Sequence, residues 1–129
     1  MKDAAEYLAC IKARIVAHPR VVRWIIVREE AQGEQGLWRY RLTLHGGDLL
    51  EMFERFQIKA GIVQVTKYSF HWQDAAGQLR QRWDNAAHHP EVSTHPHHVH
   101  DHDAEAQVHP HGPISAEEVL TLIAAAAEE

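Results

Sequence analysis

The segment IVQVTKYSFHWQDAAGQLRQRWDN, residues 62–85, decides the fold of this chain. Its first half alternates between aromatic and polar side chains, the pattern of a β-strand with one buried face. The sequence QDAAG then predicts a tight turn, because glycine tolerates the positive φ angles that such turns need. The strand QLRQRWDN follows. The segment therefore predicts a hairpin of two antiparallel strands.

Three more strands are predicted ahead of this hairpin, in VVRWIIVREE, LWRYRLTLH and LLEMFERFQI. The short connections between them favour an antiparallel meander. A helix is predicted over residues 1–18, where Asp3 and Glu6 have the spacing of a capping box and Pro19 ends the helical pattern.

A second helix is predicted over residues 115–128, beginning at the capping box of Ser115 and Glu118. Between sheet and helix, residues 88–113 carry several prolines and show no period, so they are predicted to form a histidine-rich loop. The expected fold is a single α+β domain, residues 1–129. In it, a five-stranded, mostly antiparallel meander sheet (residues 21–87) has the N-terminal and C-terminal helices packed on one face.

Charge is distributed unevenly along the chain. All thirteen Lys and Arg residues lie in residues 1–87, whereas residues 88–129 hold eight acidic residues and no Lys or Arg. No apolar run approaches the roughly 20 residues that cross a bilayer, and the start of the chain has no signal-peptide pattern. A single cysteine, Cys10, suits a reducing compartment. These features predict a soluble cytoplasmic protein without a membrane partner.

Nine of the twelve histidines follow Ala87. They are interrupted by other residues and precede a helix, which argues against a purification tag. Neutral imidazoles could instead bind a divalent transition metal such as Zn or Ni, although the spacing matches no established site. The candidate ligands are His95, His97, His98 and His100.

Acid–base chemistry without any cofactor is the competing interpretation. His71 and Asp84 are about equally far from the hairpin turn, so they could be neighbours across the two strands. A histidine can both take and give a proton near neutral pH, and an aspartate can hold it in one tautomer. Asn85, His88 and His89 follow where the chain leaves the sheet. The alternative is that His71 and Asp84 only pair with each other.

Several other side chains could contact a nucleic acid. Arg82, with Arg80 on the same predicted face, could stabilise phosphate charge, and Arg39 and Arg41 could bind phosphate from the third predicted element. An exposed basic strand face that is merely solvated is the alternative for the latter pair.

Aromatic and acidic residues leave similar choices open. Tyr68 and Trp72 could stack on bases, or they could pack in the core. Glu51 and Glu54 could be paired acids, but the sequence does not establish which way each points.

The stretch YSFHWQDAAGQLRQRWDNAAHHPEVSTHPHHVH, residues 68–100, resembles the signature of the TumE family, toxin components of prokaryotic toxin–antitoxin pairs. The signature reads Tyr-x-Tyr/Phe-His-Trp/Tyr-Gln, a short turn, Arg-Trp/Tyr-Asp-Asn-Ala-Pro-His-His-Pro and Pro-His-His-x-His. The matching residues here are Tyr68, His71, Trp72, Arg82, Asp84, Asn85, His88, His89, Pro90, His97, His98 and His100. Ala87 departs from the family's proline, and the later His102, His109 and His111 lie beyond the motif.

The resemblance implies a toxin with a cognate antitoxin, often a DNA-binding protein. It does not supply the chemistry. From the residues we infer a growth-inhibiting protein that acts on RNA, with His71 and either His88 or His89 as base and acid, Asp84 orienting and Arg82 binding phosphate. The alternatives are a metal-binding or partner-binding module without enzymatic activity, and an acidic, histidine-rich lid that responds to pH. Exposed sheet edges also allow a homodimer.

Overall fold

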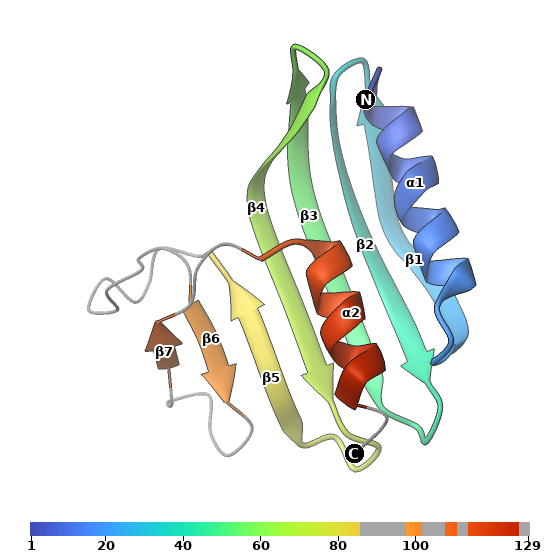
Figure 1. Cartoon of the computed structure of the whole chain (residues 1–129), viewed down its shortest axis with the longest axis vertical. Coiled ribbons are helices and arrows are strands. Elements are labelled where there is room, and N and C mark those ends of the chain that lie inside the picture. Colours follow the sequence, from blue (N-terminus) through green and yellow to red (C-terminus); the bar gives the residue numbers. More distant parts are fainter. Residues whose placement is uncertain (86–97, 102–107, 111–113, 127–129) are drawn as a thin grey trace.

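The computed structural model describes residues 1–85, 98–101, 108–110 and 114–126. Helix α1 (Ala4–Ala17) precedes five long strands, and helix α2 (Ala116–Ala126) ends the fold. The long strands are β1 (Val21–Gln32), β2 (Gln35–Leu44), β3 (Leu49–Lys59), β4 (Ile62–Gln73) and β5 (Leu79–Asp84). They form an antiparallel meander in chain order, and both helices lie across the same face (Figure 1). The predicted α+β meander is confirmed.

The prediction of a continuous loop over residues 88–113 was wrong in two places. Strands β6 (His98–Asp101) and β7 (Val108–Pro110) extend the meander beyond β5, so the sheet has seven strands within the described residues. The outer edge of β5 offers unpaired backbone N–H and C=O groups, and a short extended segment can satisfy them. Such pairing depends on a distant strand, which is why the local sequence did not reveal it.

The two helices cover one face of the sheet and bury its apolar side chains. Leu8 and Ile11 of α1 and Val119 and Ile123 of α2 are at most 4% exposed. They share one core with the inward-facing residues of the strands. The largest fully buried side chains of the strands are Trp38, Tyr40, Phe56, Phe70 and Trp83. In the described part of the chain, both helices lie on this one face (Figure 1); the opposite face, which carries no described helix, is called the open face.

Both predicted helix caps are present. Asp3 Oδ1 accepts a hydrogen bond from the backbone N–H of Glu6 at 2.9 Å. At the start of α2, the Ser115 and Glu118 side chains each accept from the other's backbone N–H, at 3.1 and 3.2 Å. No helix in the described part of the chain is long and apolar enough to cross a membrane.

Glu54 is a carboxylate in the helix-covered core. Its Oε1 accepts hydrogen bonds from the Tyr7 hydroxyl (2.6 Å) and Trp38 Nε1 (3.1 Å), and the residue is 0% exposed. Burial raises the pKa of Glu54, although the bonds from Tyr7, Trp38 and the Ala116 backbone oppose the shift. Glu51 belongs to the opposite face, so the two glutamates are not paired acids.

Glu54→Gln should change how the free energy of unfolding depends on pH. Because the folded-state pKa of Glu54 is raised, the folded state retains its proton when the unfolded chain has lost it. Stability from this group is therefore present at low pH and lost as the pH rises above the ordinary value of 4.5. Relative to Glu54→Gln, the wild type should lose up to about 1.4 kcal/mol per pH unit across this window. Urea unfolding at several pH values measures the free energy of unfolding of both proteins. If the two free energies change with pH in the same way, the prediction is wrong.

Candidate functional site

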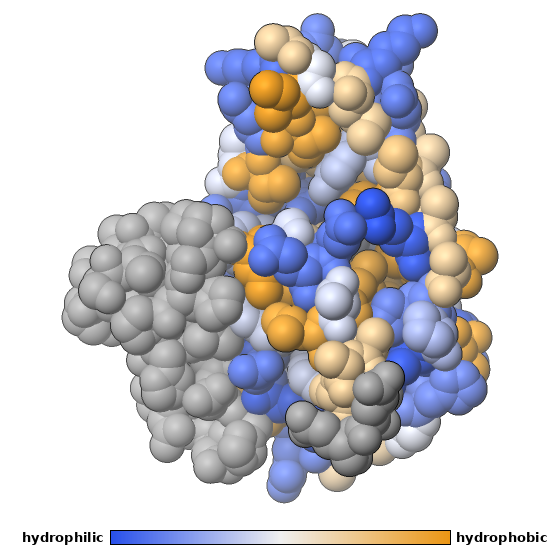
Figure 2. All heavy atoms as spheres, viewed as in Figure 1, coloured by the Kyte–Doolittle hydropathy of each residue, from blue (hydrophilic) through white to orange (hydrophobic). Residues whose placement is uncertain are grey.

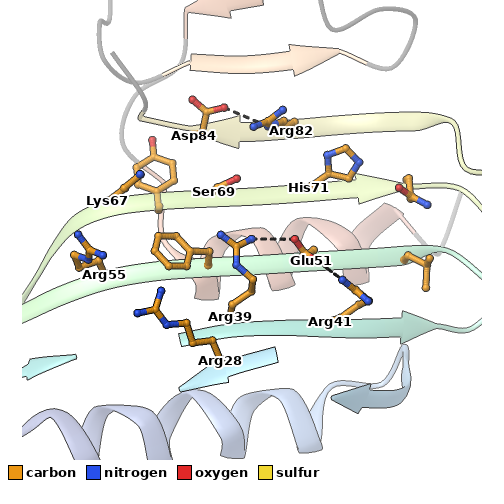
Figure 3. Close-up of a pocket in the computed structure, with 14 residues that line it drawn as sticks. Arg28, Arg39, Arg41, Glu51, Arg55, Lys67, Ser69, His71, Arg82 and Asp84 are labelled. Atoms are coloured by element: carbon orange, nitrogen blue, oxygen red, sulfur yellow. Dashed lines mark hydrogen bonds and ion pairs between the residues drawn. The ribbon is translucent and has the colours of Figure 1, made fainter. Parts of the chain in front are cut away.

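A groove of about 800 Å³ lies on the open face of the sheet (Figure 3). Among the residues that the structure describes, six cationic side chains and two carboxylates line it. The cations are Arg28, Arg39, Arg41, Arg55, Lys67 and Arg82, and the carboxylates are Glu51 and Asp84. Strand alternation explains the gathering, since every second residue of each strand points to this face. An excess of positive charge in a concave surface attracts polyanions.

Two neighbouring rows of side chains cross the groove. The first row passes from β2 to β5 through Arg41, Glu51, His71 and Arg82. The second passes through Arg39, Phe53, Ser69 and Asp84. Residues directly opposite each other in antiparallel strands lie roughly 5 Å apart at Cβ and share a face. His71 therefore stands between a carboxylate and a guanidinium.

Glu51 holds two arginines in place. Its Oε2 accepts a hydrogen bond from Arg39 Nη1 at 2.9 Å, and its Oε1 accepts from Arg41 Nη2 at 2.9 Å. Burial by itself would raise the pKa of Glu51, but the hydrogen bonds and charges of Arg41 and Arg39 outweigh it and lower the pKa. The carboxylate is thus ionised at neutral pH. Arg39 also lies over the Phe53 ring, 4.6 Å from its centroid.

Asp84 does not lie directly across from His71, as the hairpin spacing had suggested. Its partner in the register is Ser69, and His71 is opposite Arg82. Asp84 is 2% exposed, with Oδ2 at 3.4 Å from Arg82 Nε. This carboxylate is therefore paired with Arg82. Glu51 is the direct cross-strand neighbour of His71, and its two oxygens accept hydrogen bonds from Arg39 and Arg41.

Asn85 joins the end of β5 to β4. Its side-chain Oδ1 accepts a hydrogen bond from the Tyr68 N–H at 2.9 Å, and its Nδ2 donates to the Thr66 carbonyl at 3.2 Å. The carbonyl oxygen and the NH₂ group of this side chain are therefore both hydrogen-bonded to the backbone of β4. Asn85 thus holds the end of β5 against β4.

Asn85→Ala should lower the free energy of unfolding by about 1–3 kcal/mol, because it leaves the Tyr68 N–H without this acceptor. Chemical denaturation of the purified variant measures the loss. Asn85→Asp, which retains the acceptor oxygen, is the matched control and should lose less. Equal stability of Asn85→Ala and wild type would show that Asn85 does not stabilise the contact between β5 and β4.

Tyr68 and Trp72 are 4% and 8% exposed and pack in the core, and Tyr68 also lines the groove. Burial raises the pKa of Tyr68 to about 12, so its phenol stays protonated at neutral pH. Trp72 Nε1 donates to Asp48 Oδ2 at 3.0 Å.

The expectation for Arg80 was wrong. Trp72 pairs with Gln81, and the next residue, Gln73, pairs with Leu79. Arg80 therefore has no opposite residue in this register and forms a β-bulge. Arg80 lies against Asp48 (Nε to Oδ2, 2.9 Å) and the Trp72 ring, on the side opposite to Arg82.

Sequence reasoning placed Arg39, Arg41, His71 and Arg82 among candidate residues, and the open face brings all four together. It missed the roles of Glu51, Arg28, Arg55 and Lys67. The alternation of β2 and β4 was the available signal for this face. Arg28 and Arg55 lie next to register shifts in the strand pairing, so the sequence alternation does not reveal which face of the sheet their side chains are on.

Part of the histidine-rich segment falls outside the described residues, including His88, His89, His95 and His97. The proposed pH-sensitive lid lies largely outside them as well. In the backbone register, His98 is opposite Asp84 and His100 is opposite Arg82. Within the side chains that the structure describes, no group of three or more His, Cys, Asp or Glu is arranged to hold a metal ion.

Comparison with known proteins identifies the family. The family model described as Toxin TumE matches residues 11–129, nearly the whole chain. Neither the curated proteins nor the solved structures contain a match. The match includes β1 to β5, which carry the basic groove, and α2. The chain thus belongs to the TumE family, toxins of toxin–antitoxin systems, and this membership implies a cognate antitoxin as its partner.

Proposed function

We propose that this toxin inhibits growth by cleaving RNA on the open face of its sheet, in the cytoplasm where RNA is available. The observation that carries the proposal is the placement of His71 between Glu51 and Arg82 in a groove lined by six cationic side chains. Phosphate groups bind such cations, and an imidazole transfers protons near neutral pH. Together they provide the parts that phosphodiester cleavage requires.

The proposed reaction needs only proton transfer and charge stabilisation. One imidazole takes the proton of the ribose 2′-hydroxyl as its oxygen attacks the phosphorus. The bond from phosphorus to the 5′-oxygen breaks, and a second, protonated imidazole donates a proton to that oxygen. The products are a 2′,3′-cyclic phosphate and a 5′-hydroxyl end. Arg82 and Arg41 stabilise the added negative charge on the phosphoryl oxygens.

His71 is one of the two imidazoles in this proposal. The second is expected among the histidines that follow β5. His88 and His89 remain candidates, and the register adds His98 and His100 because their backbone lies beside Asp84 and Arg82. Single alanine variants of these four, assayed for cleavage, would identify the second group. It should be the one whose loss lowers the rate about as much as the loss of His71.

Purified protein incubated with total RNA in EDTA tests the proposal. Cleavage that persists and leaves 2′,3′-cyclic phosphates supports metal-free acid–base chemistry. Cleavage that needs one added metal, such as Zn or Ni, would assign the reaction to a metal held by the histidine-rich segment, with His95, His97, His98 and His100 as ligands. No cleavage under any condition would favour the alternative function, a metal-binding or partner-binding module.

A homodimer through β1 is the second proposal for partners. β1 is the outer strand of the described sheet, and Val22, Ile25, Ile26 and Val27 on it are at least 44% exposed. Apolar surface is visible at the margin where α1 and β1 lie (Figure 2). At the opposite edge of the described sheet, β7 is only three residues long. The exposed apolar residues and unpaired backbone groups of β1 fit a second copy of the same strand.

Ile25→Lys should convert such a dimer into a monomer, because a lysine at the interface adds a charge that must be desolvated. Light scattering coupled to size-exclusion chromatography measures the mass. Val16→Lys is the control, since Val16 is 70% exposed on α1 and not on the sheet edge. A wild type that is monomeric at all concentrations would refute the dimer.

A further inference from the structure

Four glutamines form a row across the open face, beyond the basic groove. Gln32 of β1 is paired with Gln35 of β2, Gln35 with Gln57 of β3, and Gln57 with Gln64 of β4. Gln57 Nε2 donates a hydrogen bond to Gln64 Oε1 at 3.2 Å. Three of the four residues are exposed, and Gln57 is half-buried. Their amides are thus presented to solvent from four adjacent strands.

Three members of the glutamine row, Gln32, Gln35 and Gln57, line a second hollow of about 880 Å³ that continues the basic groove. Arg28 and Arg55 line both this hollow and the groove. In Figure 3, Arg28 and Arg55 lie on the side of the groove away from His71 and Arg41. A strand of RNA bound in the groove therefore reaches the glutamine row by passing these two arginines.

The charges of the second hollow are different from those of the groove. Among the described residues, Arg28, Arg55, Glu29 and Glu30 are the charged residues that line it; Glu30 forms an ion pair with Arg28, and Glu29 forms one with Lys12. The second hollow thus has two cationic side chains where the groove has six, and it attracts phosphate less strongly. What it offers instead is amide groups, each with two N–H donors and a carbonyl acceptor.

Amides of this kind recognise the edges of nucleic-acid bases. A glutamine can donate to and accept from one base edge at the same time, which distinguishes one base from another. In RNA this recognition is directed mainly at single strands, because the unpaired bases expose their Watson–Crick edges. The combination of a phosphate-binding groove with an amide-rich hollow beside it fits single-stranded RNA better than a duplex.

We infer that the glutamine row binds base edges of single-stranded RNA and sets the sequence preference of the toxin; this inference rests on the proposed function. Along β4, Gln64 is roughly 23 Å from His71, at about 3.3 Å per residue. The bases read by the glutamine row are therefore several nucleotides away from the cleaved bond. Glu51, Arg82 and His71 act on any phosphodiester, and the glutamine row selects which one enters.

The test compares base preference with and without the amides. Binding to short single-stranded homopolymers of A, C, G and U is measured for His71→Ala, which keeps the RNA intact, and for the same protein with Gln35→Ala and Gln57→Ala. His71→Ala should bind the homopolymer of its preferred base about tenfold more tightly than the homopolymer that it binds least. The added alanines should reduce this preference to within about twofold and leave affinity for the least preferred homopolymer unchanged. Gln78→Ala, an exposed glutamine in the β4–β5 turn, is the control and should keep the preference.

Equal binding of all four homopolymers, no binding at all, or a preference that survives the loss of Gln35 and Gln57 would overturn the inference. A cleavage assay on the wild type separates the two proposals. If the preference depends on the glutamines but the wild type does not cleave RNA, the glutamine row stands and the catalytic proposal fails. If the wild type cleaves RNA but the base preference does not depend on the glutamines, the catalytic proposal stands and the inference about the glutamine row fails.

Discussion

His71→Ala should lower the rate of RNA cleavage by a factor of about 10² to 10⁴, the usual contribution of a positioned acid or base. His71 lies between Glu51 and Arg82 on the open face and lines the groove there. Loss of its ring removes the proton-transfer group and leaves the cations of the groove in place. The variant should therefore bind RNA almost as well as the wild type, and its expression should no longer inhibit growth. Single-turnover cleavage and a growth assay measure both effects.

Two controls separate catalysis from stability. His45→Ala removes an exposed histidine in the β2–β3 turn and should cleave RNA normally. Added imidazole should restore part of the activity of His71→Ala, which a misfolded protein would not show. At Asp84 the informative change is Asp84→Asn, because alanine would also remove a buried partner of Arg82 and destabilise the fold. Full cleavage by His71→Ala would reject the catalytic assignment.

The double variant Arg55→Ala/Lys67→Ala should weaken RNA binding by about tenfold or more at moderate salt. The two residues face each other across β3 and β4 and both line the basic groove. No ion pair of either is found within the described ranges, so both charges are available for phosphate. Each phosphate contact on a single strand contributes about 0.7 to the slope of log K against log salt. The slope should therefore become shallower by about 1.4.

Filter binding or fluorescence anisotropy across a salt series measures this slope. Lys2→Ala/Lys59→Ala removes the same charge from exposed positions that line neither hollow, so it is the matched control. It should leave the slope nearly unchanged. Equal weakening by the two double variants would mean that net charge, and not the groove, attracts RNA.

The sequence was most informative where the pattern is local. The alternation in Trp38 to Leu44 and in Tyr68 to Trp72 predicted strands with one buried face, and the structure confirms the burial. The capping boxes at Asp3 and Ser115 predicted where the helices begin. These features depend on contacts within a few residues, so the sequence contains them directly.

Pairing across strands was harder to predict, because a single bulge shifts the register by one residue. The irregularity between Trp72 and Gln73 directs Arg80 away from Arg82, and the cross-strand register makes Asp84 a neighbour of Ser69 and not of His71. The importance of Glu51 was likewise not visible, because its neighbours Arg41 and His71 come from two other strands.

By itself, the sequence determined the two helices, the five long strands and their order, the buried faces of β2 and β4, and the resemblance to the TumE family. Only the tertiary structure decided which side chains are neighbours on the open face: His71 between Glu51 and Arg82, and four glutamines in one row. The reason is physical. The buried face of a strand is determined by the hydrophobic pattern of that strand alone, whereas a site built across several strands depends on registers that their turns and bulges establish together.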